Sequence, residues 1–138
     1  MRYISIFVAF LFLTSSPIQA ESLDESVEAK IQLVISEQIK AFKNFDVKTA
    51  YSYASSLIRS IFPNAVIFGK MVENSYPMIW DPKDYQFLSL RNETGIFIQR
   101  VIFTDDLDRI FIFDYMMELS EGAWLVNGVY PINQGDGV

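Results

Sequence analysis

The sequence predicts an α+β domain in which N-terminal helices pack on a curved, four-stranded antiparallel meander. The chain has 138 residues, of which 51% are hydrophobic and 15% aromatic, a composition typical of a packed domain. In the first half of the mature chain, apolar residues recur at helical spacing. In the second half, β-branched and aromatic runs are separated by short turn segments. Because helices precede strands along the chain, we expect the α+β class.

The first 20 residues have the order of a secretory signal sequence. Arg2 precedes an apolar run from Ile4 to Leu13, and small and polar residues then lead to Ala20. The apolar run is about half of the roughly 20 residues that span a bilayer, which favours a cleaved signal over a stable membrane anchor. We therefore expect a signal peptide at 1–20, one domain at 21–134 and a flexible tail at 135–138. The protein would be exported, either to the periplasm or as a secreted protein.

The first helix of the mature chain is predicted over Val27–Lys43. Its apolar residues share one arc of a helical wheel. They are Val27, Ile31, Val34, Ile35, Ile39, Ala41 and Phe42. Gln38 falls inside this apolar arc. A buried amide must find hydrogen-bond partners or lose stability, so Gln38 is the first candidate functional residue.

Shorter helical segments are expected next. Asp46 is placed to cap a helix over Val47–Ala54, because its carboxylate can accept hydrogen bonds from the first free amides. A short helical turn is expected at Leu57–Phe62. A further helix would start after its cap, Asn64, and end before Pro77.

Four strands are predicted in the second half of the chain. They are Tyr85–Arg91, Ile96–Thr104, Ile110–Leu119 and Ala123–Ile132. The segments between them are too short for a crossover, so neighbouring strands must be antiparallel. The sheet is therefore a meander.

The middle hairpin has a predictable register. If it is centred on Leu107, Arg100 lies opposite Asp114. An ion pair across the two strands favours this register over a one-residue shift.

The last hairpin is expected to create a dent in the sheet. A two-residue turn at 121–122 would place Gly128, which has no side chain, opposite Tyr115. Gln99 would lie beside this dent, and Gln38 would approach it from the first helix.

These positions predict a pocket between sheet and helices. Gln38, Gln99 and Tyr115 would supply its polar groups, and a small apolar ligand would sit among these residues, Tyr51 and Trp124. A mostly apolar cavity with a few convergent polar groups is the usual form of a small-ligand site. The alternative is that the three polar residues bond to one another inside a closed core.

The opposite face of the sheet is too apolar for simple exposure to water. It includes the candidate interface residues Ile98, Ile102, Ile112 and Met116. Monomers seldom expose a contiguous patch of this kind, so we expect a homodimer through this face. Coverage by the C-terminal tail or by a partner protein is the alternative.

Composition excludes several classes of function. The chain has no Cys and no His, which removes disulfides, Cys/His zinc sites, thiolate nucleophiles and Ser-His-Asp triads. Its net charge of −6 argues against nucleic acid as a partner. The acidic cluster of Asp105, Asp106 and Asp108 lacks the Gly and Glu of an EF-hand loop. We expect no metal and no cofactor.

Certain residues in the helices and the last strands carry a family resemblance. They are Ile35, Gln38, Ala41, Phe42, residues 50–55, Phe68, Met71, Val72, Tyr76, Tyr115, Gly122, Trp124, Val126 and Gly128. With this order of elements, the chain resembles the nuclear transport factor 2-like (cystatin-like cone) superfamily and, more narrowly, the bacterial domain-of-unknown-function family 4864. The resemblance implies a cone-shaped fold with a pocket, and it implies no activity.

The function that we expect from the sequence is non-catalytic binding of a small hydrophobic or aromatic ligand. The alternative is a protein-interaction module, such as a secreted effector or scaffold, that acts through the apolar sheet face. A ketosteroid-isomerase-like proton-transfer enzyme is less favoured. Such an enzyme needs an inward-facing carboxylate, and the register turns Asp114 and Glu118 to the outer face.

Overall fold

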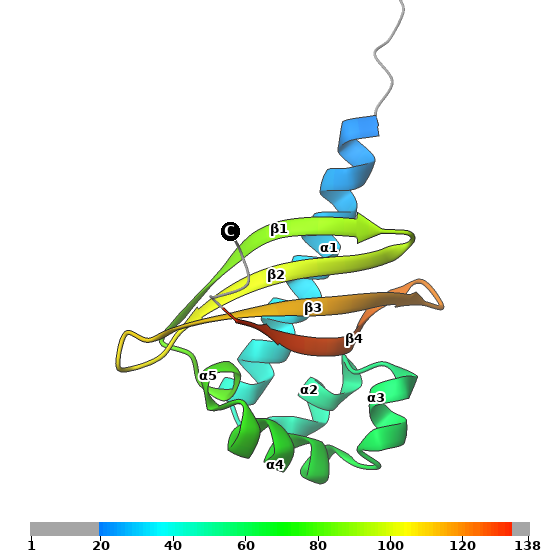
Figure 1. Ribbon diagram of the computed structural model, residues 1–138. Coiled ribbons are helices and arrows are strands. Elements are labelled where there is room, and N and C mark those ends of the chain that lie inside the picture. Colours follow the sequence, from blue (N-terminus) through cyan, green and yellow to red (C-terminus); the bar gives the residue numbers. More distant parts are fainter. Residues whose placement is uncertain (1–19, 134–138) are drawn as a thin grey trace, which may run out of the picture.

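The computed structural model describes the backbone of residues 20–133 and the side chains from Ser26 onward. Within these residues, helices are followed by a four-stranded antiparallel sheet, which confirms the α+β class (Figure 1). The predicted signal peptide, apart from Ala20, and the predicted tail at 135–138 lie outside the described residues. No described helix is both long enough and apolar enough to span a membrane.

The helices follow one another along the first part of the chain. They are α1 (Ala20–Lys43), α2 (Val47–Ser52), α3 (Ser56–Ile61), α4 (Ala65–Ser75) and α5 (Pro77–Trp80). Both predicted caps are confirmed. The Asp46 carboxylate accepts a hydrogen bond from the Thr49 amide at 3.1 Å, and the Asn64 side chain accepts one from the Ile67 amide at 2.9 Å.

Helix α1 begins at Ala20, earlier than the predicted start at Val27. The added segment contains Glu21, Asp24 and Glu25, and acidic residues favour a helix N-terminus. Hydrophobic periodicity detects only a helix face that packs on a core. It therefore misses a first segment that is mostly polar.

The strands form a meander in the order β1-β2-β3-β4. They are β1 (Asp84–Glu93), β2 (Ile96–Thr104), β3 (Ile110–Ser120) and β4 (Ala123–Ile132). The register of β2 with β3 is the predicted one, with Arg100 opposite Asp114. In Figure 1, α1 crosses behind the strands and the shorter helices gather below β4.

The register of β3 with β4 differs from the prediction. Beyond Met117, a β-bulge shifts the pairing by one residue and leaves Asn127 without an opposite partner. Tyr115 therefore lies opposite Val129 instead of Gly128. The expected dent was wrong because a tight turn fixes register only as far as the next bulge.

The core lies between α1, α4 and one face of the sheet. Ile31, Ile35 and Ile39 of α1 are completely or almost completely buried. On the sheet, Phe103 packs edge to face on Phe113, with ring centroids 5.9 Å apart. These buried side chains pack α1 against the sheet. A cavity remains between the helices and β4.

Candidate ligand-binding site

A cavity of about 210 Å³ lies between the helices and the sheet. It is bounded by α1, α3, α4 and β4, with single residues from α5 and β3. Aliphatic and aromatic side chains form most of its wall, together with three tyrosines and one amide. None of the described residues that line it is Asp, Glu, Lys or Arg. Ligand sites have this combination of an apolar wall and few polar groups.

The cavity opens to solvent between α3, α4 and the end of β4. Ile58, Phe62 and Met71 are half-buried at this opening, and Tyr130 is 54% exposed. A Cβ atom at Gly128 would come within 2.8 Å of the Tyr130 ring. The absence of a side chain at Gly128 therefore allows the Tyr130 ring to lie over the strand at the mouth of the cavity.

Gln38 supplies the amide in the wall. Its side chain is 3% exposed, and its Nε2 donates a hydrogen bond to the backbone oxygen of Ala50 at 3.1 Å. A carbonyl oxygen can only accept, so this bond fixes which end of the amide is the nitrogen. The other end, Oε1, accepts no hydrogen bond from any described residue.

The free amide oxygen faces the cavity. Among the described residues, the hydroxyl of Tyr115 is the one fully enclosed side-chain polar atom without a hydrogen bond. Gln38 Oε1 is therefore not enclosed, although the residue as a whole is buried. Because Gln38 is one of the residues that line the cavity, we infer that the exposed Oε1 is open to it.

Tyr115 also lines the cavity, and it is 1% exposed. Burial raises the pKa of its phenol far above the usual range, and the nearby Tyr85 adds to this rise, so the group stays neutral at ordinary pH. Leaving a buried hydroxyl without a partner costs about 1–3 kcal/mol. The Tyr115 hydroxyl is thus an unsatisfied group that is fully enclosed, whereas the unbonded Gln38 oxygen is not enclosed.

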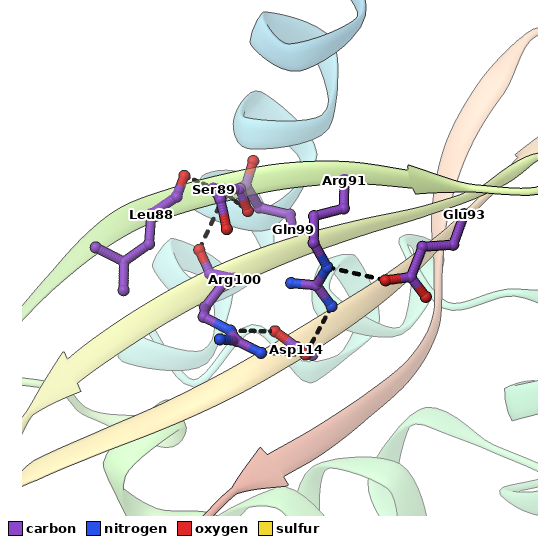
Figure 2. Close-up of polar contacts among 7 residues, drawn as sticks. All are labelled: Leu88, Ser89, Arg91, Glu93, Gln99, Arg100 and Asp114. Atoms are coloured by element: carbon purple, nitrogen blue, oxygen red, sulfur yellow. Dashed lines mark hydrogen bonds and ion pairs between the residues drawn. The ribbon is translucent and has the colours of Figure 1, made fainter. Parts of the chain in front are cut away.

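Gln99 lies away from this cavity. It is fully buried, and its Nε2 donates to the backbone oxygens of Leu88 and Arg100, each at 3.0 Å (Figure 2). These bonds span the β-bulge where β1 shifts its pairing with β2. Gln32 of α1 donates to the Gln99 Oε1 at 3.4 Å. The Gln99 amide is satisfied by this bulge and by α1.

Tyr51 and Trp124 also lie outside the cavity wall. The Tyr51 hydroxyl donates to the backbone oxygen of Phe62 at 2.6 Å, and its ring contacts Phe68 with centroids 5.5 Å apart. Tyr51 thus supports two lining residues from behind. Trp124 packs edge to face on Phe97, with centroids 5.0 Å apart. Of the five predicted ligand-binding residues, the structure brings only Gln38 and Tyr115 together in the cavity wall.

Sequence reasoning missed the side of the cavity formed by α3, α4 and the end of β4. Ile58 of α3 and Phe62, the C-cap residue of that helix, are four residues apart and are joined by a backbone hydrogen bond of 2.9 Å, which brings both to the end of the helix. That spacing is a signal that could have indicated that the two side chains belong to one wall. The alternate positions Gly128 and Tyr130 on β4 were another, because such residues share a strand face.

The outer face of the sheet carries an ion network (Figure 2). Asp114 is 8% exposed and accepts hydrogen bonds from Arg100 Nε and Nη2 at 2.8 and 2.9 Å. Arg91 Nη2 also donates to Asp114 at 3.1 Å, and Arg91 Nε donates to Glu93 at 3.1 Å. The bonds from Arg100, together with those from Arg91, hold the pKa of Asp114 below its usual value despite burial. The candidate interface residues on this face are half-buried or, in one case, buried: Ile102, Ile112, Met116 and Ile98.

Comparison with known families gives one match. A family model described as "Domain of unknown function (DUF4864)" matches residues 24–136. No curated protein and no solved structure matches the chain. The matched range contains every residue that lines the cavity.

Proposed function

The chain belongs to the family described as "Domain of unknown function (DUF4864)", and from this premise we propose that it is a non-catalytic binder of a small hydrophobic or aromatic molecule. The observation that carries the proposal is the apolar cavity of about 210 Å³ with the free Gln38 oxygen in its wall. A polar atom that is open to an apolar cavity and has no partner in the protein is suited to orient a ligand.

The lining chemistry supports binding over proton transfer. A general base must lie within hydrogen-bond reach of the proton that it removes. The described residues that line the cavity offer an amide and three tyrosines, and the phenol of Tyr115 stays neutral. These groups can hold a ligand by shape and hydrogen bonds without reacting with it.

The proposal includes a fold family and a location. Helices cover one face of an antiparallel meander and enclose a cavity against it, which supports a nuclear transport factor 2-like cone. The order of basic, apolar and small residues in 1–20 supports export to the periplasm or the medium. The protein would meet its ligand outside the cytoplasm.

A thermal-shift experiment tests the proposed function. The purified protein is heated with each member of a panel of small aromatic and aliphatic compounds. We expect at least one compound to raise Tm, because a ligand that binds only the folded state stabilises it. Met71→Trp should abolish the shift by filling the cavity, whereas Lys70→Trp, on the exposed side of the same helix, should preserve it. A shift that persists in Met71→Trp would place the ligand elsewhere.

A second candidate function is protein interaction through the outer sheet face, either between two copies or with another protein. Ile96 and Ile110 are exposed at the margin of this face, around the buried Asp114 network. A secreted scaffold or effector could use such a surface. We expect Ile112→Lys to dissociate a dimer in sedimentation experiments, and Leu57→Lys on α3 to leave it intact. A wild-type protein that sediments as a monomer would exclude the dimer.

A further inference from the structure

The chemistry of the cavity wall specifies the kind of molecule that it fits. The inference rests on the proposed function, since it assumes that the cavity is the ligand site. Three properties bear on the ligand: the unbonded oxygen of Gln38, the volume of the cavity and the absence of charge in its wall.

The polar atom requires a hydrogen-bond donor. One of the two Nε2 hydrogens of Gln38 is used by the backbone oxygen of Ala50, and Oε1 accepts no bond from any described residue, so the amide has an unused acceptor together with its second N–H. Oε1 is open to the cavity, and a ligand that fills the cavity would displace water from it, so the oxygen then gains only from a donor on the ligand. A ligand without a donor would leave Oε1 unsatisfied.

The volume limits the size of the ligand. An apolar cavity of about 150 Å³ accommodates benzene, so the cavity of 210 Å³ fits a molecule of roughly 8–10 non-hydrogen atoms. Aromatic rings form part of the wall, and the Phe68 ring contacts those of Phe42 and Phe62 at centroid distances of 5.9 and 6.1 Å. Such walls favour an aromatic ligand through edge-to-face contacts.

The charge of the wall requires a neutral ligand. None of the described lining residues carries a charge, and the Tyr115 phenol is held neutral. Burying an ion here without a partner would be costly. We propose that the natural ligand is a neutral aromatic molecule of one ring or two fused rings whose single N–H or O–H donates to Gln38 Oε1.

Two probes of equal shape test this proposal. Indole has an N–H donor, and benzofuran has nearly the same outline with no donor. Titration calorimetry should show indole binding about 5- to 10-fold more tightly, the effect of one hydrogen bond to a buried acceptor. The proton NMR signal of the indole N–H should also move downfield on binding.

Variants of Gln38 separate the outcomes. Gln38→Met keeps the volume and removes the acceptor, so it should bind the two probes equally, while Gln32→Met on the same helix should retain the preference for indole. Equal binding of both probes to the wild-type protein would overturn the donor requirement and leave the proposed function standing. Failure of both probes, together with no hit in the thermal-shift panel, would overturn the proposed function as well. If Gln38→Met does not fold, the probe pair and the NMR signal in the wild-type protein still decide the question.

Discussion

Asp114 shows at the residue scale how a buried charge is held on the outer face of the sheet. It accepts three hydrogen bonds from Arg91 and Arg100. Replacing it with Asn keeps the shape and removes the charge. We expect Asp114→Asn to lower the free energy of unfolding by about 1–3 kcal/mol at pH 7, measured by urea denaturation.

This loss should depend on pH in a defined direction. The arginines lower the pKa of Asp114 in the folded state, so its stabilising effect is fully present above the unfolded-state value of about 3.9. The effect is lost as pH falls through the lower, folded pKa. The difference between wild type and Asp114→Asn should therefore be constant from pH 5 to 7 and shrink below about pH 4. Asp106→Asn, at an exposed hairpin position, serves as the control. An undiminished difference at pH 2 would contradict the ion-network explanation.

The two buried glutamines show what can be predicted for single residues. Hydrophobic periodicity and strand register placed both Gln38 and Gln99 in the interior, and both are buried. Their partners could not be predicted from the same patterns. Gln99 bonds to backbone oxygens exposed by the β1 bulge, and Gln38 bonds to Ala50 on another helix. A residue pattern shows that a side chain is buried, but its partners depend on how distant segments meet.

At the scale of elements, the contact between α2 and α4 depends on a glycine. Gly69 of α4 is buried, and a Cβ atom there would collide with the Val47 side chain of α2. Ala normally stabilises a helix by about 1 kcal/mol relative to Gly. Here we expect Gly69→Ala to destabilise the protein instead, by about 1–3 kcal/mol, because the interior becomes overpacked.

A compensating substitution tests the cause. Val47→Ala removes the atoms that the new methyl group would meet, so the double variant should recover most of the stability lost by Gly69→Ala. Chemical denaturation of the wild type, the two single variants and the double variant gives the coupling free energy between Val47→Ala and Gly69→Ala. Additive effects would show that Val47 is not responsible.

The β3–β4 turn contains a strained residue that can be improved. Glu121 has a φ of 50° and Gly122 one of 81°, the left-handed conformations of a two-residue hairpin turn. Asn adopts this conformation more readily than Glu. We expect Glu121→Asn to raise the free energy of unfolding by about 0.5–1 kcal/mol in denaturant titrations. Glu118→Asn, in the extended strand β3, should fail to stabilise, because Asn is disfavoured in strands.

Elements were more predictable than the site because their signals are local. The strands Ile96–Thr104 and Ala123–Ile132 have their predicted bounds, since turn residues mark their ends. The bulge lies at Asn127, next to Gly128. A glycine inside a strand often marks a bulge, but it does not show by how much the register shifts. That bulge changes how β4 meets the helices, and the cavity wall depends on it. The cavity lies between sheet and helices, and of the five expected ligand-binding residues Gln38 and Tyr115 line it.

For the whole molecule, the cavity is a cost in stability. At about 24 cal/mol per Å³ of unfilled volume, 210 Å³ corresponds to at most on the order of 5 kcal/mol, the upper limit because the mouth opens to solvent. Single domains are stable by only about 5–15 kcal/mol. Proteins commonly give up stability of this kind where function requires it.

Filling part of the cavity should therefore raise the stability of the protein and lower its affinity for a ligand. Val72 lines the cavity, and one added methylene in Val72→Ile can extend into unfilled volume. We expect this change to raise the free energy of unfolding by about 0.5–1 kcal/mol and to weaken binding of any cavity ligand.

Val101→Ile is the matched control, because Val101 is fully buried and lies outside the cavity wall. There the same methylene meets closely packed neighbours and should destabilise by about 1–3 kcal/mol. If Val72→Ile destabilised the protein as much as Val101→Ile, the volume beside Val72 would not be available to a ligand, and the binding function proposed for this cavity would lose its basis.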